Sequence, residues 1–186
     1  GYRHCRDHWW TNLLYVNNLV PFKDDTTQQC FGHGWYLADD MQFFIILPLF
    51  VVAYMYNRRA GYASLFVGFW ASIIYSLWGA GHFGFSASQL EQSPHQVDYY
   101  YVRPWTRIPP YLVGSATALL LNDVSSKPSP LSCEAMKLVA LLILGLCYFG
   151  AYPFYQTQDN LHTKDGLKHL NHSYVALTKP AWAIAL

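Results

Sequence analysis

Two adjacent carboxylates, Asp39 and Asp40, stand near the start of a long apolar stretch. After Asp40 no charged residue follows until Arg58, so the pair lies at the mouth of a segment suited to hydrocarbon. Acidic residues at a helix N-terminus complement the helix dipole, which is a purely structural use. A carboxylate this close to hydrocarbon is also costly and is commonly functional. We take Asp40 as a candidate catalytic residue, a supporting acid, and Gln42 in the same turn as a candidate substrate contact.

Two arginines, Arg103 and Arg107, precede a later apolar stretch with a spacing of four residues. Beside Trp105 they would serve structurally as anchors at the membrane surface. Guanidinium groups also bind carboxylates and phosphates through paired hydrogen bonds, which makes both arginines candidate contacts for an anionic substrate. Pro104 interrupts a continuous helix, so the two side chains need not share a face. We favour Arg107, which is nearer to the membrane.

All eight histidines fall in polar segments or at the ends of apolar ones. His33 and His82, which flank apolar stretches, are best placed to face a shared cavity, and His33 is taken as a candidate substrate contact. His4 and His8 have the spacing of two zinc ligands, but a zinc site needs more ligands than these. No metal site is predicted, and the other histidines are interpreted as solvated.

Long apolar stretches typical of membrane helices must position these residues. About 20 helical residues, rising about 1.5 Å each, cross the roughly 30 Å hydrocarbon layer. Helix is favoured there because a spanning segment must satisfy its own backbone polar groups. The sequence therefore predicts an all-α, multipass transmembrane bundle. Four spans are expected at about residues 35–56, 60–81, 105–121 and 135–155, with a truncated fifth from about residue 175.

The composition fits a chain whose main partner is the lipid bilayer. Hydrophobic residues make up 53% and charged residues 12%, against a usual charged share of about 25%. A net charge of +1 gives no indication of a nucleic-acid partner. The sequence has neither a Gly-rich phosphate loop nor a Gly-X-Ser-X-Gly motif, so soluble-type nucleotide or serine-hydrolase chemistry has no support. From its two ends, Gly1 and the apolar stretch to Leu186, we expect an internal fragment of one larger membrane domain.

The doubled arginine Arg58-Arg59 lies between the first two expected spans. The positive-inside rule places this turn in the cytoplasm. Alternation then puts three segments on the extracellular or lumenal side, namely residues 1–34, 82–108 and 156–174. The organelle and the oligomeric state are left open.

Two chemical features agree with this sidedness. Cys5 and Cys30 both fall in the first outer segment, where an oxidising compartment allows a disulfide, whereas Cys133 is cytoplasmic and Cys147 lies within a span. The alternative is a pair of free or metal-binding thiols. Asn171, in the sequon Asn-His-Ser, also falls outside and is a candidate glycosylation site.

Three stretches of the sequence resemble the nose-resistant-to-fluoxetine proteins, the animal branch of the membrane acyltransferase type 3 family. The first runs from Cys5 through Trp-Trp-Thr-Asn and Cys30 to Trp-Tyr-Leu-Ala-Asp-Asp-Met-Gln-Phe and Pro48. The second is Tyr-Val-Arg-Pro-Trp-Thr-Arg-Ile-Pro-Pro-Tyr-Leu-Val-Gly at residues 101–114, and the third is Tyr-Val-Ala-Leu-Thr-Lys-Pro-Ala-Trp-Ala at residues 174–183. The chain departs from that branch at Ala118, near the place of a second glycine, and at Lys179, where arginine is common.

The resemblance implies a multipass enzyme that moves an acyl group, from a donor such as acyl-CoA, to a hydroxyl of a carbohydrate, lipid or small acceptor. It also implies a histidine base on an early membrane helix, which we expect to precede Gly1. None of the eight histidines matches that base, so no residue here is assigned the role. No bound cofactor is expected.

Three functional hypotheses follow. In the favoured one, Asp40 polarises a partner at the outer mouth while Arg107 holds an anionic part of the donor or acceptor. The second is a non-catalytic transporter, or a protein that handles lipids or xenobiotics, with the same fold and cavity. The third is a receptor-like scaffold whose Cys5–Cys30 loop binds a partner.

We predict that a cysteine at Arg59→Cys is protected from a membrane-impermeant maleimide on intact cells, because the turn is expected in the cytoplasm. The full-length protein would carry serine at Cys133 and Cys147, and Gln92→Cys in an expected outer loop is the matched control. Permeabilisation should expose the first cysteine, whereas the second should react without it. Labelling of Arg59→Cys on intact cells would reverse the assigned sidedness.

Overall fold

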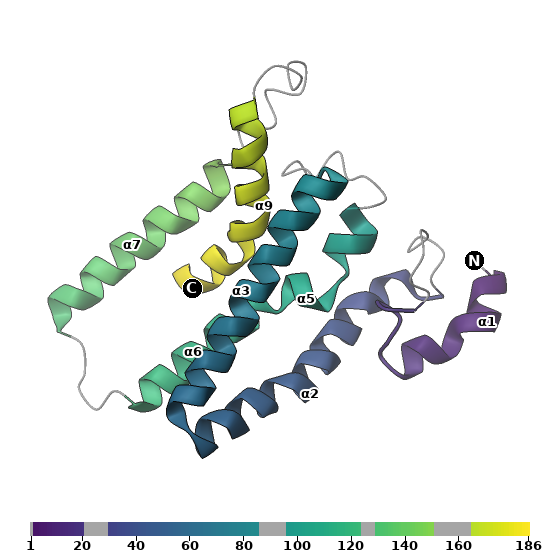
Figure 1. The fold of residues 1–186 in the computed structure, drawn as a ribbon, viewed down its shortest axis with the longest axis horizontal. Helices are drawn as coiled ribbons and strands as arrows, with labels where there is room; N and C mark the ends of the chain where they lie inside the picture. Colours follow the sequence, from purple (N-terminus) through teal and green to yellow (C-terminus); the bar gives the residue numbers. More distant parts are fainter. Residues whose placement is uncertain (1, 21–29, 86–95, 124–128, 151–164) are drawn as a thin grey trace.

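The computed structural model describes residues 2–20, 30–85, 96–123, 129–150 and 165–186, and within these ranges the regular structure is entirely helical (Figure 1). The long helices are α1 (Tyr2–Leu13), α2 (Trp35–Tyr56), α3 (Arg58–Phe83), α6 (Pro109–Asp123), α7 (Pro130–Phe149) and α9 (Asp165–Ala185). Shorter elements are the 3-10 turn η2 (Gly32–Gly34), the π-helical turn η4 (Val97–Tyr101) and α5 (Pro104–Arg107). The all-α prediction is confirmed for the described residues.

Helices α2 and α3 form a hairpin joined by the single residue Asn57. Asn57 is extended, and its side chain accepts a hydrogen bond of 2.9 Å from the backbone N–H of Arg59, which caps α3. Gly61 lies directly against α2, because a Cβ built on it would be 2.4 Å from the Cα of Tyr54. The absence of a side chain at this position therefore sets how closely the two helices approach.

The C-terminal end of α6 is fastened to this hairpin through Asp123. Its carboxylate accepts hydrogen bonds from the hydroxyls of Tyr54 at 2.5 Å and Tyr62 at 2.9 Å, and it forms an ion pair with Arg58 at 2.9 Å. The hydrogen bond from Tyr54 and then that from Tyr62 lower the pKa of Asp123 below its ordinary value, with Arg58 acting in the same direction. The carboxylate is therefore charged at neutral pH and ties three helices together.

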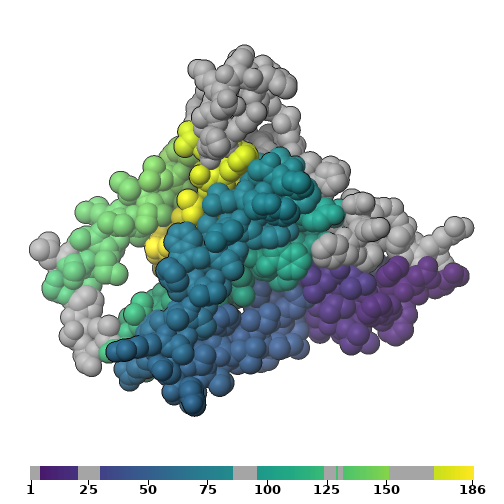
Figure 2. Space-filling view, viewed as in Figure 1, coloured from purple at the N-terminus to yellow at the C-terminus, as the bar shows by residue number. Residues whose placement is uncertain are grey.

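Helix α3 is the centre of the fold, packed against α2, α6 and α9, and α7 packs against α9. Figure 2 shows α3 crossing the visible face, with α7 beyond α9 at one side. Many large apolar side chains of the long helices are exposed, among them Phe44 at 74%, Met55 at 79% and Tyr148 at 72%. Apolar surface of this extent suits lipid rather than water.

Three helical stretches of the described chain are long and apolar enough to cross a membrane, namely Gly32–Tyr56, Arg58–Phe83 and Ser132–Phe149. They correspond to the first, second and fourth expected spans. The third, at residues 105–121, is not confirmed, because the chain there forms α5 and then α6, a helix of only 15 residues. Such a helix is about 22 Å long, short of the roughly 30 Å needed. Pro104 and Pro109 each begin a helix, as prolines do, and so divide the apolar stretch.

Three expected loops contain helix. Helix α9 begins at Asp165 rather than near residue 175, so residues 165–174 are not the predicted loop. The polar residues of its first turns conceal it from a criterion based on apolar length. The expected outer loop at residues 82–108 contains η4 and α5, and α1 occupies part of the expected outer segment 1–34.

The predicted disulfide between Cys5 and Cys30 is confirmed, and Cys133 and Cys147 are free. Asn171 lies in α9, where its Nδ2 donates a hydrogen bond of 2.8 Å to the backbone oxygen of Phe85. Glycosylation of Asn171 and the sidedness of the loops stay predictions. Two of the histidines, at positions 95 and 162, lie outside the described residues.

We expect Gly61→Ala to destabilise the full-length protein by roughly 1–3 kcal/mol, since the added methyl group must push α2 away from α3. The measurement is the thermal unfolding temperature in detergent. The matched control is Gly145→Ala in α7, where no atom lies within 4 Å of the new Cβ. This control should unfold no lower than the wild type, because alanine favours helix more than glycine does. Equal unfolding temperatures for the two variants would show that the hairpin contact is dispensable.

Candidate functional site

A polar cavity of about 500 Å³ opens near the N-terminal end of α2. Residues of α2, α5, α6 and α9 line it: Trp35, Tyr36, Asp39, Asp40, Phe43, Arg107, Pro110, Tyr111, Lys179 and Trp182. Two acidic and two basic side chains therefore share one space with aromatic walls. The predicted residues Asp40 and Arg107, far apart in the sequence, meet here.

Arg107 is held between two aromatic rings. Its Cζ lies 4.4 Å from the ring centroid of Trp35 and 4.5 Å from that of Tyr101, and its Nε donates a hydrogen bond of 2.6 Å to the backbone oxygen of Tyr101. A guanidinium stacks on aromatic faces at little cost because its charge is delocalised and weakly hydrated. The contacts fix the plane of the side chain, while its terminal nitrogens make no hydrogen bond with described residues. Arg107 is therefore a fixed cation available to a ligand.

Asp40 is fixed from α6. The hydroxyl of Tyr111 donates a hydrogen bond of 2.5 Å to Asp40 Oδ1, and the ring of Tyr111 packs on Phe43 with centroids 4.5 Å apart. Asp40 nevertheless remains exposed. The carboxylate is thus oriented by the protein and still accessible from the cavity.

Asp39, the neighbouring carboxyl, is only 3% exposed. Its Oδ1 accepts a hydrogen bond of 2.7 Å from the side chain of Asn18, whereas its Oδ2 has no partner among the described residues. Gln42 holds Asn18 in turn, since its Nε2 donates to Asn18 Oδ1 at 2.8 Å and to the backbone oxygen of Tyr15 at 2.9 Å. The segment after α1 therefore docks onto α2 and orients Asp39, and the second carboxyl oxygen stays buried without a partner among the described residues.

Lys179 reaches the same cavity from α9. Its Nζ lies 3.8 Å from the ring centroid of Tyr100, and in the described part of the chain this buried amino group has no hydrogen-bond partner. The Tyr100 hydroxyl donates a hydrogen bond of 2.5 Å to the backbone oxygen of Val175, so the ring is fixed against α9. A ring face compensates the burial of this group only in part, because its N–H groups still lack acceptors.

Arg103 lies outside the cavity lining and supports the site from behind. It is 1% exposed; its Nη1 donates to the backbone oxygen of Asn18 at 2.5 Å, and its Nε donates to the backbone oxygen of Asp98. Burial lowers the pKa of Arg103, and the charge of Asp98 opposes that shift. The backbone of Arg103 is extended, as expected before proline. Its side chain lies against backbone oxygens, an environment different from that of Arg107.

The predicted site residues divide into three groups. Asp40 and Arg107 line the cavity, Arg103 and Gln42 brace it, and His33 lies exposed in η2. No group of three metal-ligating side chains is found in the described ranges. Cys5, which lies between His4 and His8 in the sequence, forms the disulfide with Cys30.

Asp39, Tyr111 and Lys179 line the cavity but were not chosen from the sequence. Helical spacing would have identified Asp39, because Trp35, Asp39 and Phe43 are four residues apart and share one face. Tyr111 carries no comparable local signal, whereas Lys179 is a charged residue in the expected fifth span and could have been selected on that ground.

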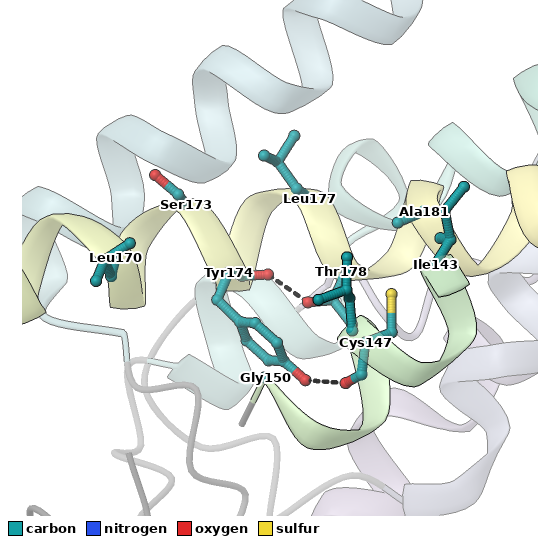
Figure 3. Close-up of a pocket in the computed structure, with 10 residues that line it drawn as sticks. Ile143, Cys147, Gly150, Leu170, Ser173, Tyr174, Leu177, Thr178 and Ala181 are labelled. Atoms are coloured by element: carbon teal, nitrogen blue, oxygen red, sulfur yellow. Dashed lines mark hydrogen bonds between the residues drawn. The ribbon is translucent and has the colours of Figure 1, made fainter. Parts of the chain in front are cut away.

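A second cavity, of about 510 Å³, lies between α7 and α9 and is mainly apolar (Figure 3). Tyr174 crosses it and donates a hydrogen bond to the backbone oxygen of Cys147, while Thr178 donates to the backbone oxygen of Tyr174. Ala181 and Thr178 line this space, whereas their neighbours Trp182 and Lys179 line the polar cavity. Adjacent faces of α9 therefore bound two spaces of different character.

Comparison with known proteins adds two findings. The model of the acyltransferase domain family matches residues 6–185. The chain is 32% identical over 201 residues to nose resistant to fluoxetine protein 6 from Caenorhabditis elegans. The matched region covers 98% of this chain but only 23% of that relative. No solved structure matches the chain.

Replacing Asn18 by alanine should destabilise the full-length protein by roughly 1–3 kcal/mol, since it leaves the buried oxygen of Asp39 without its donor. Thermal unfolding in detergent measures the effect. Asn12→Ala is the control, because the buried amide atoms of Asn12 have no hydrogen-bond partner among the described residues. If both variants lose the same stability, Asn18 does not hold Asp39 in the way its geometry indicates.

Proposed function

Because the chain belongs to the acyltransferase domain family, we propose that it is part of an integral membrane enzyme that transfers an acyl group to a hydroxyl. The acceptor is a carbohydrate, a lipid or another small molecule, and the donor is an acyl thioester such as acyl-CoA. The chain spans 23% of the length of the relative that it matches. The activity of the whole protein is therefore proposed from the family of this one part.

One observation carries this proposal. Among apolar helices suited to a membrane, Arg107 and Asp40 converge on a single cavity. A fixed guanidinium suits an anionic part of the donor or acceptor, since it offers a planar set of N–H donors. A carboxylate held by Tyr111 suits the orientation or polarisation of a reacting partner.

The proposed division of labour leaves the proton-accepting base to a part of the protein beyond this chain. The family resemblance implies a histidine on an early membrane helix for that step. Asp40 and Arg107 then act as orienting and charge-binding groups at the mouth of the cavity, on the outer side if the sidedness prediction holds.

We predict that Asp40→Asn in the full-length protein lowers acyl transfer by about 100-fold or more, as loss of a group acting on protons does. The assay follows radioactivity from labelled acetyl-CoA into esters of isolated membranes, with release by hydroxylamine as proof of the ester. Asp7→Asn is the matched control, because Asp7 is an exposed carboxylate paired with Arg6. Expression and surface level should be equal in all three proteins.

Two outcomes contradict the proposal at different levels. If transfer survives Asp40→Asn, that carboxylate has no catalytic role. If the wild type makes no ester but moves a labelled lipid or sugar across the membrane without any acyl donor, the protein is a transporter instead.

A further inference from the structure

Two buried polar atoms of residues that line the cavity lack partners in the described part of the chain: Oδ2 of Asp39 and Nζ of Lys179. One comes from α2 and the other from α9, and both residues line the same space. Leaving a buried carboxyl oxygen and a buried amino group unpaired is expensive. A ligand that satisfies both groups would recover that cost on binding.

The chemistry of the two atoms selects the kind of ligand group. An anion would fit Lys179 but would be repelled by the carboxyl oxygen of Asp39, and a cation would meet the reverse conflict. A hydroxyl donates one hydrogen bond and accepts others, so it can donate to Asp39 and accept from Lys179 at the same time. No ion pair joins Asp39 and Lys179 among the described residues, so neither group satisfies the other.

We propose that Asp39 and Lys179 together bind the hydroxyl of the acyl acceptor, an inference that rests on the proposed acyl transfer for the role of that hydroxyl. Both groups are held in place before any ligand arrives, Asp39 by Asn18 and Lys179 by the ring of Tyr100. Such preorganisation reduces the cost of binding.

The assignment gives two groups of cavity residues different roles. Asp39 and Lys179 position the acceptor oxygen, while Arg107 holds an anionic part of the donor. In the transfer, the hydroxyl oxygen bonds to the acyl carbon and the bond from that carbon to the thioester sulfur breaks. The hydroxyl proton passes to the sulfur by way of the base, so the donor leaves as a thiol.

The test uses full-length protein in membranes and no acyl donor. Dicyclohexylcarbodiimide modifies the Asp39 carboxyl, and peptide mass spectrometry measures the modified fraction, with Asp39→Asn as the proof of site. The protecting probes are 1-octanol and its isomer 1-methoxyheptane. The ether accepts from Lys179 but has no proton to donate to Asp39. We expect 1-octanol to protect Asp39 at about tenfold lower concentration, which corresponds to the loss of one hydrogen bond.

Lys179 is tested by the same protection. Lys179→Met should raise the concentration of 1-octanol needed for half protection by about tenfold, and Lys179→Arg should restore it, because arginine keeps a charged donor. Lys137→Met is the matched control, since Lys137 is an exposed lysine paired with Glu134 on α7, and it should behave as wild type. Elution from a sizing column in detergent checks that each variant is folded.

Four results would overturn the inference: equal protection by the two isomers, protection by neither, an unchanged response in a folded Lys179→Met, or no modification of Asp39 without alcohol. If Lys179→Met does not fold, the comparison of isomers on the wild type decides. Ester formation without any difference between isomers would remove this inference and leave the proposed function. Selective protection without ester formation in the wild type would remove the proposed function and the acceptor role, and leave only a hydroxyl-binding site.

Discussion

The buried guanidinium of Arg103 is the contact on which the arrangement of the site depends. It joins the backbone of Asn18 to that of Asp98, two segments otherwise distant in the chain. The side chain of Asn18 then orients Asp39, and the segment that begins near Asp98 carries Arg107 into the cavity and places the ring of Tyr100 against Lys179. A single buried cation thereby connects the residue that orients Asp39 with the segment that carries Arg107. Removing a partner from such a buried set is costly, which favours one arrangement over alternatives.

The fold follows the sequence wherever apolar length alone decides it. The runs that became α2, α3 and α7 are long, poor in charge and free of internal breaks other than Pro48, so lipid immersion and helix could be predicted together. The apolar stretch at residues 105–121 misled because its total length hides the two starts imposed by Pro104 and Pro109. Helix α9 was underestimated for the opposite reason, since polar residues open it and its packing against α3, α6 and α7 compensates for them.

The site shows where local pattern stops being informative. Arg107 and Asp40 could be selected because charge beside hydrocarbon is expensive wherever it occurs. The same reasoning could not separate Arg103 from Arg107, because one is buried against backbone oxygens and the other is stacked between rings, and that difference arises from tertiary contacts. Lys179 lies more than a hundred residues after Asp39, so its approach to the carboxyl is a property of how α9 packs.

Helix α9 separates the polar cavity from the apolar space beside α7, with Lys179 and Thr178 on its two sides. It therefore forms a wall of both cavities, so a sideways shift of α9 that narrows one cavity would widen the other. The two spaces are thus linked through one helix, and a substitution that repacks α9 against α7 would also change the surroundings of Lys179.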